Sequence, residues 1–251
     1  GRGISSIYRV DVLTGDLEQV ADGTPMKANR WLTSIDGEPM MAIEYNNKTG
    51  QQRHYIAPNG SGGEWVRHDT LHPNSDIQLD FDGTTFLKPR ATVLRYGADQ
   101  NTLYLAENFT TGRYRVVEYD PIEGVIRRVV HEDSVYDTYD ALAYNELLLD
   151  GSGEPIGVGY VRERPEVQWV SEQGQALFDT ISAQTEAPNV RLVDVRPEAG
   201  IALAVLSDEV GRREVGLYRF ETDELTIQAE LSDHLDDYTL PKTQTIRYDA
   251  R

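Results

Sequence analysis

Four charged side chains gather in one short stretch of the chain: Arg162, Glu163, Arg164 and Glu166. An arginine there can bind an anionic or carbonyl group of a ligand, and a glutamate can bind an amine, through charge-assisted hydrogen bonds. The alternative, which we favour from the sequence, is an ion-pair lattice that anchors the irregular segment beside them. We keep all four as candidate substrate-binding residues.

Catalytic residues are not expected in this chain. The Gly-x-Ser-x-Gly sequence that presents a nucleophilic serine does not occur, and Gly60-Ser61-Gly62 and Gly151-Ser152-Gly153 have the flanking residues of hairpin turns. The chain has no cysteine, which excludes a cysteine nucleophile, disulfides and thiolate metal sites.

Two patterns resemble metal sites, and both are incomplete. His68 and His72 are four residues apart, but Pro73 follows at once and no glutamate stands between them where a zinc site needs it. Residues 80–83 resemble the start of a calcium loop, yet Ala91 occupies the twelfth position, where glutamate belongs. We interpret both as loops or turns and expect no metal ion and no other cofactor.

The charge of the chain limits its partners. Its formal net charge is −18, from 42 acidic and 24 basic residues, which repels nucleic acid and anionic lipid. No apolar run approaches the roughly 18 residues of a membrane span, and no signal peptide opens the sequence. We expect neither a nucleic-acid nor a membrane partner, and a location in the bacterial cytoplasm or periplasm, with the cytoplasm favoured.

A hairpin pattern recurs along the chain and must position these residues. It stands at residues 7–17 (IYRVDVLTGDL), 116–126 (VVEYDPIEGVI) and 217–227 (LYRFETDELTI), with a longer turn at 54–66. Asp120 matches Asp11, and Gly124 matches Gly15. In the copy at 217–227, Glu221 stands where the other two copies have aspartate, and the turn is one residue shorter. Four-stranded units closed by such hairpins are typical of a β-propeller, which binds or guards ligands more often than it carries out chemistry.

The remaining alternating segments complete an all-β fold of about four to five recognisable four-stranded blades. We expect strands near 31–35, 39–45, 53–57, 64–67, 92–96, 103–107, 114–119, 125–130, 156–161, 190–195, 201–206, 214–220 and 225–230. We also expect a hairpin at 76–90, a strand or helical turn at 140–150, and a strand at 243–248. Apolar residues at mixed three-to-four spacing predict a short helical insertion near 170–183. For Trp31, Trp65 and Trp169 we favour packing between blades over a ligand platform, which is the alternative.

Within residues 156–185, the segment IGVGYVRERPEVQWVSEQGQALFDTI resembles the propeller of bacterial members of the prolyl oligopeptidase family of serine peptidases, of the acylaminoacyl or dipeptidyl peptidase kind. In that family a strand with the pattern GY…RPEV.W runs into a helical insertion. The following VRLVDVRPEAGIALAVLSDEVGRREVGLYRFETDEL resembles its last blade. The ending LPKTQTIRYDAR is similar to the crossing into the catalytic α/β-hydrolase domain.

The resemblance implies a propeller domain over 1–240, with its first blades missing, and the start of a linker over 241–251 into an absent hydrolase domain. The family's propeller covers the active site, excludes folded proteins and admits short peptides. The chain alone would then be no enzyme, whereas its parent would be a serine-type peptidase. The alternative is a stand-alone propeller that binds a protein or a ligand. Exposed blade edges favour a homo-oligomer.

Overall fold

The structure, a computed structural model, describes residues 3–34, 37–45, 52–57, 63–68, 91–97, 101–108, 111–139, 146–162, 165–208, 210, 213–232, 238, 241 and 246. Most of these residues lie in antiparallel strands, and one segment forms an α-helix. The chain divides into two compact units, Gly1–Glu132 and Asp133–Arg251.

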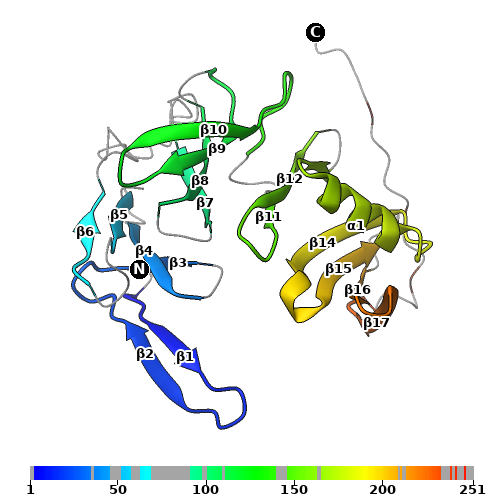
Figure 1. The fold of residues 1–251 in the computed structure, drawn as a ribbon, viewed down its shortest axis with the longest axis horizontal. Coiled ribbons are helices and arrows are strands. Elements are labelled where there is room, and N and C mark those ends of the chain that lie inside the picture. The colour runs from blue at the N-terminus through cyan, green and yellow to red at the C-terminus, as the bar shows by residue number, and fades with distance from the viewer. Residues whose placement is uncertain are drawn as a thin grey trace. The chain divides into compact units, whose positions relative to one another are not determined.

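The described part of the first unit contains three antiparallel sheets, in which each strand pairs with the next along the chain (Figure 1). One is a two-stranded hairpin of β1 (Ile7–Val10) and β2 (Leu17–Ala21). Another contains β3 (Arg30–Thr33), β4 (Pro39–Tyr45), β5 (Gln52–Ile56) and β6 (Val66–Arg67). The last contains β7 (Ala91–Tyr96), β8 (Leu103–Glu107), β9 (Arg115–Asp120) and β10 (Val125–His131).

The second unit contains two further sheets within its described residues (Figure 1). The three-stranded sheet is formed by β11 (Glu146–Leu149), β12 (Pro155–Val161) and β13 (Pro165–Trp169), and the helix α1 (Glu172–Ser182) follows it. The four-stranded sheet is formed by β14 (Asn189–Arg196), β15 (Ile201–Ser207), β16 (Arg213–Arg219) and β17 (Glu224–Glu230). A short 3₁₀ turn, η2 (Pro197–Ala199), joins β14 to β15.

Four-stranded antiparallel meanders are the blades of β-propellers. The all-β class, the propeller-type blades and the helix expected near 170–183 are therefore confirmed. In the described residues, α1 follows β13 at the place where the other large sheets have a fourth strand. No helix in the described ranges is long and apolar enough to cross a membrane.

Several expected elements lie outside the described residues. These are the hairpin at 76–90, residues 140–145 and, apart from Ile246, the strand at 243–248. Within the ambiguous segment 140–150, Glu146–Leu149 forms a strand. One propeller domain over 1–240, with a linker after it, stays a prediction.

The matched hairpins form matching turns. Oδ1 of Asp11 and Oδ1 of Asp120 each accept hydrogen bonds from the backbone N–H groups two and three residues later. Gly15 and Gly124 then take left-handed φ angles of 79° and 73°, which strain any residue with a Cβ. The spacing of aspartate and glycine thus encodes the turn itself.

Each unit has hydrophobic clusters of its own. In the first unit, one cluster includes Met41, Ile43, Leu103, Leu105 and Val117, and a smaller one packs Trp31 and Trp65 edge to face at 5.4 Å. In the second unit, a cluster includes Ile156, Leu177, Ile181, Leu192, Ala204 and Leu206. In β15, the alternate residues Ala202, Ala204 and Leu206 supply the cluster of the second unit, as the period of two predicts.

The position of α1 is set by its cap and by two apolar residues. Oγ of Ser171 accepts a hydrogen bond from the N–H of Gly174 at 3.0 Å, and Glu172 adds a negative charge to the first turn. Leu177 and Ile181, four residues apart, are buried in the cluster of the second unit. The helix therefore packs against β12, β13 and β14.

Candidate functional site

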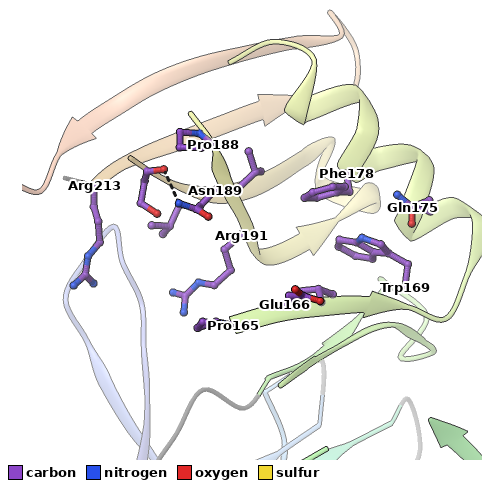
Figure 2. A pocket seen from close by; sticks show the side chains of 13 residues that line it. Pro165, Glu166, Trp169, Gln175, Phe178, Pro188, Asn189, Arg191 and Arg213 are labelled. Carbon is purple, nitrogen blue, oxygen red and sulfur yellow. Dashed lines mark hydrogen bonds between the residues drawn. The ribbon is translucent and has the colours of Figure 1, made fainter. Parts of the chain in front are cut away.

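A groove of about 760 Å³ lies in the second unit, between β13 and α1 on one side and β14, β15 and β16 on the other (Figure 2). Its apolar lining includes Pro165, Val167, Trp169, Phe178, Val190 and Val205. Its polar lining consists of Glu166, Gln175, Asn189, Arg191, Ser207 and Arg213. Apolar walls with a few polar groups are typical of ligand-binding sites.

Trp169 and Phe178 form an aromatic pair in this groove. Their ring centroids are 5.3 Å apart and their planes are inclined by 36°. Two glycines leave space for the indole, because a Cβ added at Gly157 or at Gly174 would lie 3.0 Å from the Trp169 ring. Gly157 is also the direct partner of Trp169 in the pairing of β12 with β13. The position of Trp169 therefore depends on residues that have no side chain.

The strand register brings two arginines to one face of the four-stranded sheet. Ser207 on β15 pairs with Asn189 on β14 and with Arg213 on β16, and two residues earlier along β15, Val205 pairs with Arg191. Because side chains alternate between faces, Arg191 and Arg213 lie on the same face. Nδ2 of Asn189 donates a hydrogen bond to the carbonyl oxygen of Ser207 at 3.4 Å.

The charged and aromatic groups are separated along the groove. Figure 2 shows the guanidinium groups of Arg191 and Arg213 toward one end, with Trp169 and Phe178 toward the other. Both arginines are exposed. Within the described part of the chain, the side chain of Arg213 has no ion-pair partner. Arg213 can therefore accept an anionic group at this end of the groove.

Of the four candidate residues from the sequence, Arg162 and Glu166 are described, whereas Glu163 and Arg164 lie outside the described residues. Nη1 of Arg162 lies 3.7 Å from Oε2 of Glu166, and its Nε lies 3.6 Å from Oδ2 of Asp133. The structure thus places Arg162 in an ion-pair network, while Glu166 joins that network to the groove. A substrate-binding role for these residues stays a prediction.

Asp133 is the centre of this network. Burial by itself would raise the pKa of the Asp133 carboxyl. Hydrogen bonds from the N–H groups of Val135 and Tyr136 and from the Tyr160 hydroxyl outweigh this effect. Together with the nearby charge of Arg162, they lower the pKa from 3.8 to about 2. The Tyr160 hydroxyl donates to Oδ2 of Asp133 at 2.8 Å. Burial, followed by this hydrogen bond, raises the pKa of Tyr160. The Arg162 guanidinium carbon also lies 5.4 Å from the centroid of the Tyr136 ring.

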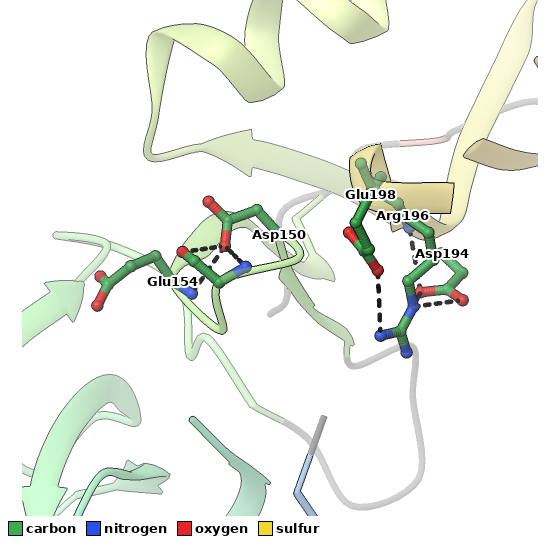
Figure 3. Close-up of polar contacts among 7 residues, drawn as sticks. Asp150, Glu154, Asp194, Arg196 and Glu198 are labelled. Atoms are coloured by element: carbon green, nitrogen blue, oxygen red, sulfur yellow. Dashed lines mark hydrogen bonds and ion pairs between the residues drawn. The ribbon is translucent and has the colours of Figure 1, made fainter. Parts of the chain in front are cut away.

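A second polar cluster in the same unit is accounted for by local contacts (Figure 3). Oδ1 of Asp150 accepts hydrogen bonds from Ser152 and from the N–H of Glu154, which closes the turn between β11 and β12. Arg196 lies 3.2 Å from Asp194, and its Nη1 lies 4.0 Å from Glu198. In the ranges that the structure describes, no three histidine or carboxylate side chains gather as a metal site requires. Of the earlier metal patterns, His72 and residues 80–83 lie outside those ranges.

Sequence reasoning did not single out Arg191 or Arg213, and for Trp169 it favoured packing over a ligand platform. The arginines are far apart in the sequence, and only the register of β14, β15 and β16 places them on one face. One usable signal was present: in β14 the polar residues Asn189 and Arg191 alternate with apolar ones. That alternation marks a polar face, but it does not say what lies opposite.

No protein-family model matches the sequence, and no curated protein matches it. Among solved structures, the chain is similar to TolB from Acinetobacter baumannii, with 14% identity and a TM-score of 0.47 over 90% of this chain and 49% of that one. It is similar to a prolyl endopeptidase, with 14% identity and a TM-score of 0.48 over 91% of this chain and 31% of that one. Prolyl oligopeptidase B from Galerina marginata gives 14% identity and a TM-score of 0.42, over 86% and 28% of the two chains.

The chain spans half or less of the length of these three proteins. Prolyl oligopeptidases, the family that the sequence resembles, are thus among the similar solved structures. At these identities and TM-scores, the likeness carries no information about function.

Proposed function

We propose that this chain is a non-catalytic propeller module that gates, and helps to bind, short peptide substrates for a serine-peptidase hydrolase domain outside this chain. The groove of the second unit is the observation that supports the proposal. It combines an aromatic pair, aliphatic side chains, amide and hydroxyl groups, and charges of both signs. An extended peptide offers partners for all of these through its side chains, its backbone amides and its two charged ends.

The size of the groove suits a short peptide. Its volume of about 760 Å³ falls within the roughly 300–1,000 Å³ that is usual for small-ligand sites. A few residues in extended form fill such a space, whereas a folded protein does not. Because a short peptide loses much conformational freedom on binding, we expect dissociation constants between about 1 μM and 1 mM.

Calorimetric titration of the chain with the tripeptide Ala-Ala-Phe tests peptide binding. Val205→Trp fills the groove from the middle of β15, and we expect it to weaken binding at least tenfold. Ile201→Trp is the matched control, because Ile201 lies on the same face of β15 but outside the groove lining. Absence of measurable binding by the unmodified chain, or equal binding by the Val205→Trp variant, would contradict the proposal.

The hydrolase partner requires a separate test. Sequencing the native reading frame beyond Arg251 should reveal a Gly-x-Ser-x-Gly motif followed by an aspartate and a histidine, the order of the triad in α/β-hydrolases. A stop codon soon after Arg251 would remove the peptidase part of the proposal. The groove would then belong to a stand-alone ligand-binding module.

A further inference from the structure

We propose that the groove recognises the free C-terminal carboxylate of a peptide, together with a large apolar or aromatic side chain close to that end. This inference rests on the peptide-binding function proposed above and adds the direction in which the peptide lies. The carboxylate binds at the end with Arg191 and Arg213, and the apolar side chain binds beside Trp169 and Phe178 (Figure 2).

The two arginines make this groove a local exception on an acidic protein. The charged lining residues are two arginines and one glutamate, which gives the groove a formal charge of +1, whereas the whole chain carries −18. Guanidinium groups bind carboxylates through paired, charge-assisted hydrogen bonds. An anion that approaches the chain is repelled over much of its surface. Anions should therefore bind preferentially at the end of the groove that holds the two arginines.

Glu166 is the group that would instead favour a peptide amine, and its position argues against that orientation. Its carboxylate already lies 3.7 Å from the Arg162 guanidinium, which offsets part of its charge. A peptide amine would have to compete with the Arg162 guanidinium for this carboxylate. A peptide carboxylate meets no such competitor at Arg213 within the described residues.

The aromatic pair explains why the neighbouring side chain should be large and apolar. Trp169 and Phe178 are each only partly buried, and both face the groove. An apolar side chain that covers them removes apolar surface from water, and an aromatic one adds ring contacts with the pair. Val167 and Val205 extend the same apolar lining.

Four peptides titrated into the unmodified chain by calorimetry test the inference. They are Ala-Ala-Phe as the free acid, the same peptide as its C-terminal amide, the free acid with an acetylated N-terminus, and the amidated peptide Ala-Asp-Phe. We expect the two free acids to bind about tenfold more tightly than either amidated peptide, because only they carry the terminal carboxylate.

Arg213→Gln and Arg191→Gln should each remove most of this preference. Arg219→Gln, on the same strand as Arg213 but outside the groove, should leave it intact.

Each other outcome overturns the inference. Equal affinity for Ala-Ala-Phe acid and amide would overturn carboxylate recognition and leave peptide binding standing. Loss of binding on N-acetylation would show that the amine is recognised. Tight binding of amidated Ala-Asp-Phe would assign the arginines to an acidic side chain. If no peptide binds, the proposed function fails together with the inference. The comparison of acid with amide uses the unmodified protein, so it does not depend on the folding of a variant.

Discussion

Asp133 shows how a single carboxylate can hold together the charged network beside the groove. It accepts hydrogen bonds from Val135, Tyr136 and Tyr160, and it lies 3.6 Å from Arg162. All of these contacts favour the ionised carboxylate. Since Arg162 in turn contacts Glu166, the network links Asp133 to one edge of the groove.

Asp133→Asn should lower the free energy of unfolding by about 1–3 kcal/mol at pH 7, because the charge-assisted hydrogen bonds are weakened. The folded-state pKa of about 2 lies below the ordinary 3.8, so the stabilisation is complete above about pH 4. It should be lost as the pH falls toward 2, where Asp133 becomes protonated even in the folded state. Urea titrations from pH 7 to pH 2 should therefore show the gap between variant and unmodified chain closing below pH 4.

Asp179→Asn is the control for this measurement. Asp179 is exposed on α1 and accepts a side-chain hydrogen bond from Gln175, so its replacement should change stability little at any pH. A gap for Asp133→Asn that stayed constant down to pH 2 would refute the role assigned to its ionised form.

Gly157→Ala should disturb the aromatic pair. The added Cβ would lie 2.9 Å from Val167 and 3.0 Å from the Trp169 ring, so both side chains must move. We expect a loss of about 1–3 kcal/mol in unfolding free energy, as is usual for an overpacked site, and a changed tryptophan emission spectrum. Gly3→Ala, where the new Cβ meets nothing within 4 Å, should change neither. An unaltered spectrum for Gly157→Ala would mean that Trp169 does not depend on this glycine.

At the scale of the secondary-structure element, α1 depends on its N-cap. Ser171→Ala removes the hydrogen bond to the N–H of Gly174 and should cost about 1 kcal/mol, measured by thermal or urea unfolding. Ser171→Asp should restore most of this loss, because aspartate is also a good N-cap. Since α1 carries Phe178 into the groove, Ser171→Ala should also weaken peptide binding, and Ser171→Asp should not.

Elements whose signals are local were predictable from the sequence. The turn at Gly124 follows from an aspartate and a glycine four residues apart, and the helix at 172–182 follows from apolar spacing. The periodicity of the sequence did not reveal strand β13. A run of charged residues precedes this strand, and the spacing of apolar residues continues without a break from the strand into α1. Only the family resemblance indicated a strand at this place. The groove was not predictable at all, since β13, α1 and three later strands contribute to it.

At the scale of the whole molecule, the first unit exposes apolar side chains on the β1–β2 hairpin. Val12 and Leu13 at its tip are 90% and 93% exposed. Among the described residues, β1 pairs with β2 alone, so its other edge offers backbone groups to a further strand. We therefore predict self-association, seen as a mass that rises with protein concentration in light scattering.

Val12→Ser combined with Leu13→Ser should shift this association to higher concentrations, because it removes apolar surface from the hairpin tip. Val135→Ser is the control, since Val135 is also exposed, at 68%, but lies in the second unit. A monomer mass at every concentration would exclude association through the hairpin.

The order in which strands pair has a consequence for how the protein is made. In every sheet of the described chain, each strand pairs with its immediate neighbour in sequence, so each meander closes through local contacts. Chains with local contacts fold quickly, and domains form during synthesis as each segment leaves the ribosome. Strand pairing within a meander can therefore begin as soon as that meander has left the ribosome. Its apolar face is covered only when the neighbouring sheet follows, because the cluster that contains Met41 and Leu103 draws on both β4 and β8.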